Sequence, residues 1–201
     1  VLVAEAMGDD APDHLTISAT HTHEAPDSMG QWGAITNAND ILPRVSGVNP
    51  AHMELIRSQT ALAVADAVAT LRSAKLRIAT VRSGTDGFFR DSRAPQVMDA
   101  PITLLQAVGL DGGQTIATVF NWGNHPEILS DVNNKISSDF AHPLREALEQ
   151  GLDGQDGRPD LPGLGGIAIY LQGAVGGLMT QLGVDVFDFN GELTKRRSYH
   201  S

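Results

Sequence analysis

The clearest chemical feature of the chain is a pair of histidines, His21 and His23, separated by a single threonine. Successive side chains of an extended segment point to opposite sides, so residues two apart share a side and can face one point. Imidazole nitrogen is a common zinc ligand, with bonds of roughly 2.0–2.1 Å. The pair therefore favours a metal or catalytic site. The alternative is two loop histidines that only form hydrogen bonds.

A third histidine, His125, also follows a segment with strand character, residues 115–121, and is surrounded by small and polar residues. Ligands of α/β proteins tend to bind beyond strand ends, at one edge of the sheet. We therefore predict that His125 converges with His21 and His23 on a single divalent cation. The alternative for His125 alone is a capping or loop histidine.

Other polar residues are weaker candidates for the same site. Asp139 follows two serines at a predicted helix start, where a carboxylate commonly offsets the helix dipole, so a capping role competes with a site role. Arg90 lies in a polar loop and could bind a substrate carbonyl or an anion, or belong to an exposed charged cluster. Glu24 and Glu127 adjoin the histidines, and we expect them to be solvated carboxylates.

The composition is that of a folded, acidic protein. The chain has 201 residues, of which 41% are hydrophobic, and a formal net charge of −10. Nucleic-acid binders usually carry a basic patch; the one basic cluster here, residues 195–197, is short, so we expect no nucleic-acid partner. No segment approaches the ~20 apolar residues of a membrane-spanning helix. The absence of cysteine excludes disulfides and thiolate zinc ligands.

The elements that must position these residues follow from hydrophobic periodicity and turn signals. Strands mixed with helices predict an α/β fold: a mixed β-sheet flanked by helices, with the metal site at strand ends. The predicted strands are 14–20, 76–82, 102–108, 115–121 and 167–171, the third and fourth forming a hairpin through Asp111-Gly112-Gly113. Predicted helices run from Pro50, capped by Asn49, to about Ser73, and from near Ser138. Residues 1–7 are interpreted as the end of a helix, and residues 24–48, 84–100 and 151–166 as loops.

Four segments, in order over about residues 14–181, resemble motifs of the neutral/alkaline (non-lysosomal) ceramidase family. They are Ile17-Ser-Ala-Thr-His-Thr-His23 followed by Ala25-Pro26, then Phe120-Asn-Trp-Gly-Asn-His125 (one residue shorter than the family segment), Ile136-Ser-Ser-Asp139 and Tyr170-Leu-Gln-Gly-Ala-Val-Gly176. The resemblance implies that residues 1–201 are part of a single catalytic domain, truncated at both ends.

The resemblance also implies a zinc amidase that cleaves the N-acyl bond of ceramide, a sphingolipid, with a metal-activated water. It places Zn²⁺ on His21 and His125 and has His23 line the active site. We take His23, Asp139 and Arg90 as the catalytic candidates. The expected partner is a small or lipid-like N-acyl substrate, and the expected location, by resemblance alone, is secreted or periplasmic.

The sequence departs from the family pattern at two points. Met179 stands where the family has its serine nucleophile, and a thioether cannot act as one; this favours metal-activated water and leaves the substrate open. The family completes its zinc shell with a downstream Glu and Tyr, which we expect beyond Ser201. The alternatives are a non-catalytic or ester-cleaving homologue that keeps the fold and metal site, and, more remotely, a convergent metal hydrolase.

Overall fold

The computed structural model describes residues 7–34, 45–82, 87–154, 159–176, 179–187 and 191–196. The chain forms two compact units, one made of residues 1–17 and 25–72 and the other of residues 18–24 and 73–201. The first unit contains a short 3₁₀ helix, η1 (Gly8–Asp10), and the helix α2 (Pro50–Ala69). The segment with His21 and His23 belongs to the second unit, together with His125.

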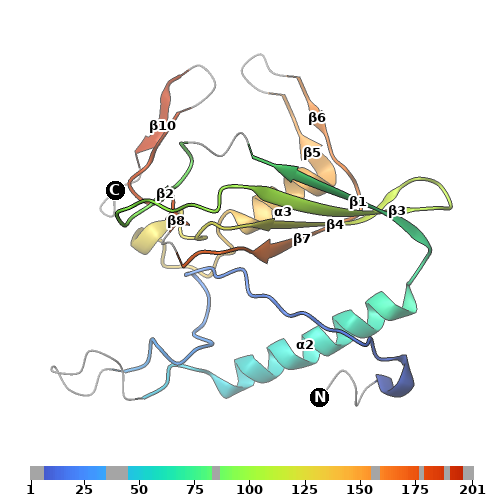
Figure 1. Ribbon diagram of the computed structural model, residues 1–201. Helices are drawn as coiled ribbons and strands as arrows, with labels where there is room; N and C mark the ends of the chain where they lie inside the picture. The colour runs from blue at the N-terminus through green and yellow to red at the C-terminus, as the bar shows by residue number, and fades with distance from the viewer. Residues whose placement is uncertain are drawn as a thin grey trace. The chain divides into compact units, whose positions relative to one another are not determined.

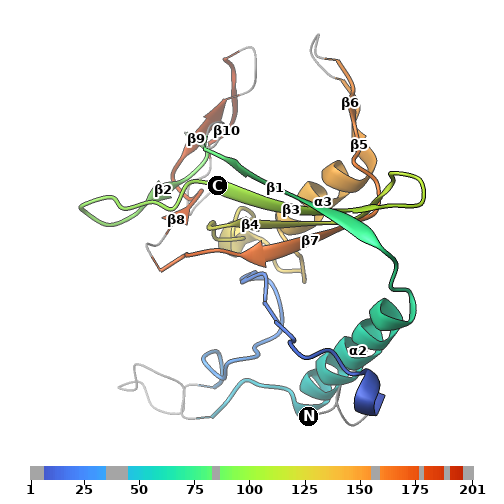
Figure 2. The same cartoon turned by 45° about the vertical axis from the view of Figure 1, so that its right-hand side comes forward.

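The second unit is built on a four-stranded mixed sheet. Its strands are β1 (Ala74–Val81), β3 (Ile102–Gly109), β4 (Thr115–Trp122) and β7 (Ile167–Gln172), in the order β1-β3-β4-β7 (Figures 1 and 2). The first two pairings are antiparallel, and β4 pairs with β7 in parallel. The predicted mixed sheet and its hairpin are confirmed. Gly113 in the hairpin turn has a φ of +71°, which glycine adopts without strain.

Three short ladders complete the strands of the described residues. β2 (Arg90–Asp91) pairs with β8 (Met179–Thr180), β5 (Gly151–Leu152) with β6 (Leu161–Pro162), and β9 (Asp185–Phe187) with β10 (Leu193–Arg196). β2, β5 and β6 fall in segments that the sequence predicts as loops. The reason is that a two-residue ladder is too short to leave an alternating pattern.

One face of the sheet forms the core with the helix α3 (Ala141–Gln150). Phe120, Ala168 and Tyr170 are buried on this face, together with Ala141 at the start of α3. Partly buried apolar residues pack around them: Ile102, Leu104, Trp122, Phe140, Leu144 and Leu148. The predicted common face of Phe140, Leu144 and Leu148 is thus confirmed, and it joins α3 to the sheet strands that lead towards His125.

The predicted strand over residues 14–20 is wrong, because this segment forms no strand and its apolar residues are exposed, Ile17 at 71%. Alternation of apolar and polar residues indicates a strand only where a neighbouring strand and a core stabilise it. The structure supplies neither to residues 14–20. The His-Thr-His segment must therefore be positioned by other contacts.

Both predicted helices form, with shifted ends. Asn49 caps α2 by accepting from the backbone N–H groups of Ala51 and His52, as predicted, but the helix ends at Ala69 instead of near Ser73. The helix expected from Ser138 begins at Ala141, because Asp139 has a φ of +52°, outside the α-helical region. The predicted N-terminal helix falls mostly on residues 1–6, outside the described residues.

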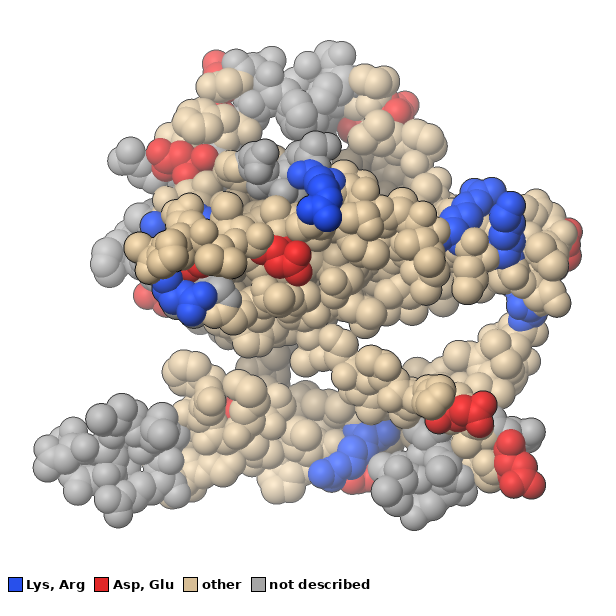
Figure 3. Space-filling model, viewed as in Figure 1, with Lys and Arg blue, Asp and Glu red and all other residues tan. Residues whose placement is uncertain are grey.

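The surface in the view of Figure 3 is largely uncharged, with acidic and basic side chains in small separate groups. The sheet contributes apolar side chains to the surface on the face opposite α3: Leu76, Ile78, Leu105 and Ile169 share that face through cross-strand pairing and are exposed. Within the described ranges, no helix combines the length and the apolar character that a bilayer crossing requires.

Truncating Phe120 should test the core. Its side chain is 2% exposed, and its ring centroid lies 5.2 Å from that of Tyr170. Phe120→Ala should lower the free energy of unfolding by about 3–5 kcal/mol, because it removes buried apolar area and leaves a cavity. The measurement is urea unfolding followed by circular dichroism. Ile78→Ala, at a side chain 75% exposed, is the control and should cost about 0.5 kcal/mol or less. Equal losses for the two variants would contradict this packing.

Candidate metal centre

Hydrogen bonds to two loops hold the His-Thr-His segment in place. The backbone N–H of His23 donates to the carbonyl of Pro126 at 3.3 Å, and the Thr22 hydroxyl donates to the carbonyl of Ser137 at 3.0 Å. The N–H of Ser137 in turn donates to the carbonyl of Glu24 at 3.0 Å. These contacts join residues more than a hundred positions apart. They replace the ladder that the sequence predicts for residues 14–20.

His21 adopts a backbone conformation that an extended segment does not have. Its φ is +68°, in the left-handed region that few non-glycine residues occupy. The structure therefore does not bring His21 and His23 together as alternate residues of one strand. The two rings still come together, with centroids 5.1 Å apart. A local turn of the backbone thus produces the convergence that we predicted from strand geometry.

His125 is buried three residues beyond the end of β4 and is fixed by one backbone carbonyl. Its backbone N–H donates to the carbonyl of Met179 at 3.0 Å, and its Nδ1 lies 2.6 Å from the same oxygen. Since a carbonyl oxygen can only accept, Nδ1 must carry the proton. In the neutral ring, the lone pair is then on Nε2. A carbonyl partner on the other ring nitrogen is typical of metal-ligating histidines.

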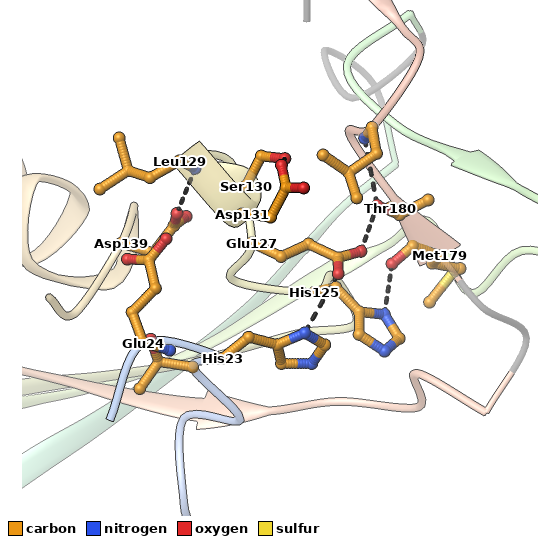
Figure 4. A network of polar contacts seen from close by, with 12 residues as sticks. His23, Glu24, His125, Glu127, Leu129, Ser130, Asp131, Asp139, Met179 and Thr180 are labelled. Atoms are coloured by element: carbon orange, nitrogen blue, oxygen red, sulfur yellow. Dashed lines mark hydrogen bonds and ion pairs between the residues drawn. The ribbon is translucent and has the colours of Figure 1, made fainter. Parts of the chain in front are cut away.

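His23 is oriented through a carboxylate instead. Its Nδ1 lies 3.1 Å from Oε2 of Glu127, and Oε1 of Glu127 accepts a hydrogen bond from the Thr180 hydroxyl (Figure 4). The Thr180 hydroxyl also accepts from the N–H of Leu182 at 3.1 Å. His23 therefore has its Nδ1 engaged, as His125 does, which leaves Nε2 as the nitrogen able to bind a cation.

The three imidazoles form a compact group. Ring centroids are 4.9 Å apart for His21 and His125 and 5.4 Å apart for His23 and His125, and one nitrogen from each ring lies within 4.8 Å of the others. Tetrahedral zinc with bonds of 2.0–2.1 Å would bring such nitrogens to about 3.3 Å from one another. The group could hold a metal ion if the three nitrogens moved slightly closer together. Among the described residues, these three histidines are the group whose ligand atoms converge in this way.

The surroundings of the rings shift their proton affinity in different directions. Burial, followed by the neighbouring His125 and His23, lowers the pKa of His21 and favours its neutral, ligating form. The hydrogen bond with Glu127 raises the pKa of His23 against the opposing effect of burial. Burial by itself would raise the pKa of Glu127, but the hydrogen bonds from His23 and Thr180 outweigh it and lower that pKa. Glu127 is therefore a carboxylate anion, not the solvated surface group that the sequence suggests.

Asp139, a predicted catalytic residue, is buried beside the site and bonded to backbone groups. Its Oδ2 accepts from the N–H of Leu129 at 2.9 Å and its Oδ1 from the N–H of Phe140 at 2.7 Å. Figure 4 shows it next to Glu24, at the far end of the network from Met179. Through these bonds Asp139 stabilises the loop before α3. Its catalytic role stays a prediction.

Arg90, the other predicted catalytic residue, lies on β2 opposite Thr180 of β8. Its Nε donates to the carbonyl of Leu182 at 3.2 Å, and the side chain is otherwise largely exposed. Arg90 thus sits one strand away from the residues that orient the histidines. Its role towards a substrate also stays a prediction.

Sequence reasoning missed the residues that orient the rings. Glu127 is close to His125 in the sequence, and this proximity was a signal, but a carboxylate next to a histidine is usually solvated. The Met179 carbonyl and the Thr180 hydroxyl lie more than fifty residues from His125, and no sequence pattern marks a backbone carbonyl as a partner. These groups could be found only from the fold.

No protein-family model matches the chain, and no curated protein matches it. A solved structure described as "Ceramidase complexed with C2" is similar with a TM-score of 0.44 and 16% sequence identity, over 65% of this chain and 22% of that one. The matched part of this chain thus spans less than a quarter of the length of that ceramidase. A similarity this low assigns neither a fold nor an activity to the chain.

The structural task of Asp139 can be tested by Asp139→Ala. This change leaves the partly buried N–H groups of Leu129 and Phe140 without their acceptor, and an unsatisfied group costs up to about 1–3 kcal/mol. We expect a loss of unfolding free energy in that range in urea unfolding. The control is Asp131→Ala, at an exposed side chain of the 3₁₀ helix η2 (Ser130–Val132), which should change stability by about 0.5 kcal/mol or less. An Asp139→Ala protein as stable as the parent would contradict the structural task.

Proposed function

We propose that the chain carries the metal centre of a zinc-dependent hydrolase that cleaves an amide (N-acyl) bond. The observation that carries the proposal is the convergence of His21, His23 and His125 on one point. The second support is in the sequence, where four motifs resembling those of ceramidases occur in order, and both histidine segments are among them. A lipid-like N-acyl compound is therefore the proposed substrate class.

The donor set fits zinc. Three imidazole nitrogens and no thiolate are a known catalytic zinc set, in which the fourth position is open to water or substrate. His23 and His125 both have Nδ1 engaged, by Glu127 and by the Met179 carbonyl, so each offers Nε2. Zinc held there would supply an activated water and polarise the substrate carbonyl.

The chain's own residues limit the choice of nucleophile. Met179, at the position of the family serine, is 1% exposed and has no nucleophilic atom for acyl transfer. The neighbouring Thr180 hydroxyl donates to Glu127 and accepts from the Leu182 N–H, so it serves as a structural link. A metal-activated water is therefore the proposed nucleophile, and the reaction would then be a direct hydrolysis without an acyl-enzyme.

The alternative is a non-catalytic or ester-cleaving homologue that keeps the fold and the metal site. The specific observation in its favour is Met179 in place of the serine. Zinc binding without hydrolysis of N-acyl or ester substrates would support the non-catalytic homologue. Turnover restricted to esters would support the ester-cleaving homologue. Both outcomes would contradict the proposed amidase while leaving the metal site intact.

Removing a metal ligand should weaken zinc binding strongly and abolish hydrolysis. His21→Ala and His125→Ala are expected to weaken zinc binding by more than about 100-fold, because changes to ligand-orienting residues alone cost 10–100-fold. Zinc content is measured by atomic absorption, and activity with fluorogenic N-acyl and ester substrates before and after chelation.

The control is His142→Ala, which removes an exposed histidine of α3 that pairs with Glu146 on the same helix. This variant should keep parental zinc content and activity. Hydrolysis that persists after chelation, or in His125→Ala, would overturn the proposed function.

A further inference from the structure

We infer that Glu127 is a positioning residue of the metal centre. Its carboxylate, anchored by Thr180, holds the His23 imidazole so that Nε2 of His23 faces His21 and His125. The inference rests on the proposed metal-dependent function and adds to it a supporting carboxylate outside the ligand set. His23 then acts as a third metal ligand, whereas the family resemblance implies only that His23 lines the active site.

The need for such support follows from the exposure of His23. The side chain of His23 is 45% exposed, whereas His125 is buried and has two hydrogen bonds to one carbonyl. An exposed imidazole without a partner would sample several rotamers, and ordering it on a cation would cost conformational entropy. Glu127, whose side chain is 17% exposed, meets Nδ1 at 3.1 Å and removes that freedom before the cation arrives.

Thr180 fixes the carboxylate in turn. Its side chain is buried, its hydroxyl donates to Oε1 of Glu127, and the same hydroxyl accepts from the N–H of Leu182 at 3.1 Å. Because each oxygen of Glu127 already has a partner, the carboxylate is oriented by two contacts on opposite sides. This arrangement suits a residue that holds an imidazole, not one that carries protons to a substrate.

The two-residue strand β8 thereby supports two of the three imidazoles. Its first residue, Met179, orients His125 through a backbone carbonyl, and its second residue, Thr180, orients His23 through Glu127 (Figure 4). Both rings are held at Nδ1, and both offer Nε2. Carboxylate and carbonyl partners of this kind raise ligand basicity and fix the ring tautomer.

The test compares zinc affinity across a small set of full-chain variants. Glu127→Ala should weaken zinc binding about 10–100-fold, the range found when the hydrogen-bond partner of a metal-ligating histidine is lost. Glu127→Gln keeps an acceptor without the charge and should lie between Glu127→Ala and the parent. Thr180→Val should weaken binding less than Glu127→Ala, and Thr180→Ser, which keeps the hydroxyl, should match the parent. Affinity is measured by competition with a chromophoric chelator, and cobalt spectra report the number of bound nitrogens.

Two controls separate positioning from general damage to the fold. Glu146→Ala removes the carboxylate of another histidine–glutamate pair, His142–Glu146 on α3, and should leave zinc affinity unchanged. In a His23→Ala background, Glu127→Ala should have no further effect on zinc affinity, because Glu127 acts through His23. A purely structural role would lower affinity equally in both backgrounds. If Glu127→Ala does not fold, Glu127→Gln and Thr180→Val provide the same comparison.

The outcomes distinguish this inference from the proposed function. A parent chain that binds zinc, with a Glu127→Ala variant of the same affinity, would overturn the positioning role and leave the hydrolase proposal standing. A further loss of affinity on adding Glu127→Ala to His23→Ala would also overturn it. A parent chain that binds neither zinc nor cobalt would overturn the proposed function itself.

Discussion

The candidate metal centre depends on the contact between His125 and the backbone carbonyl of Met179. The N–H and the Nδ1 of His125 both reach that oxygen, which joins the end of β4 to β8 across 54 positions of the chain. Because the acceptor belongs to the backbone, the orientation of the ring depends on the path of the chain at β8. The side chain at position 179 is not part of the contact. A methionine there is therefore compatible with a working metal site.

Close packing around this contact explains the glycine two residues before His125. A Cβ atom on Gly123 would lie 2.6 Å from the Met179 side chain and 2.8 Å from the carbonyl oxygen of Ala174. The Met179 contact is with the tip of a flexible side chain, but the Ala174 contact is with backbone, so a side chain at position 123 would have to move the loop after β7. The absence of a side chain at Gly123 thus allows the segment after β4, which carries His125, to pack closely against the loop after β7.

Local patterns predicted much of the sheet, and they failed where stability comes from distant partners. The hairpin of β3 and β4, the strands β1 and β7 and the body of both helices follow from periodicity and turn residues, which are local properties. The segment 14–20 has the same alternation but finds no strand to pair with. The three histidines converge as predicted, although the strand that was to align His21 and His23 does not form.

The sequence by itself determined the donor types of the candidate site, the spacing of His21 and His23, and the strand that leads to His125. These follow from residue identity and from interactions over a few positions. Only the tertiary structure decided which groups orient the rings, since Glu127, Thr180 and the Met179 carbonyl come together through the pairing of β2 with β8 and the turn beyond β4. The physical reason is that a hydrogen bond between groups about fifty residues apart depends on how the whole chain folds. Such a bond produces no periodic pattern in the sequence of either segment.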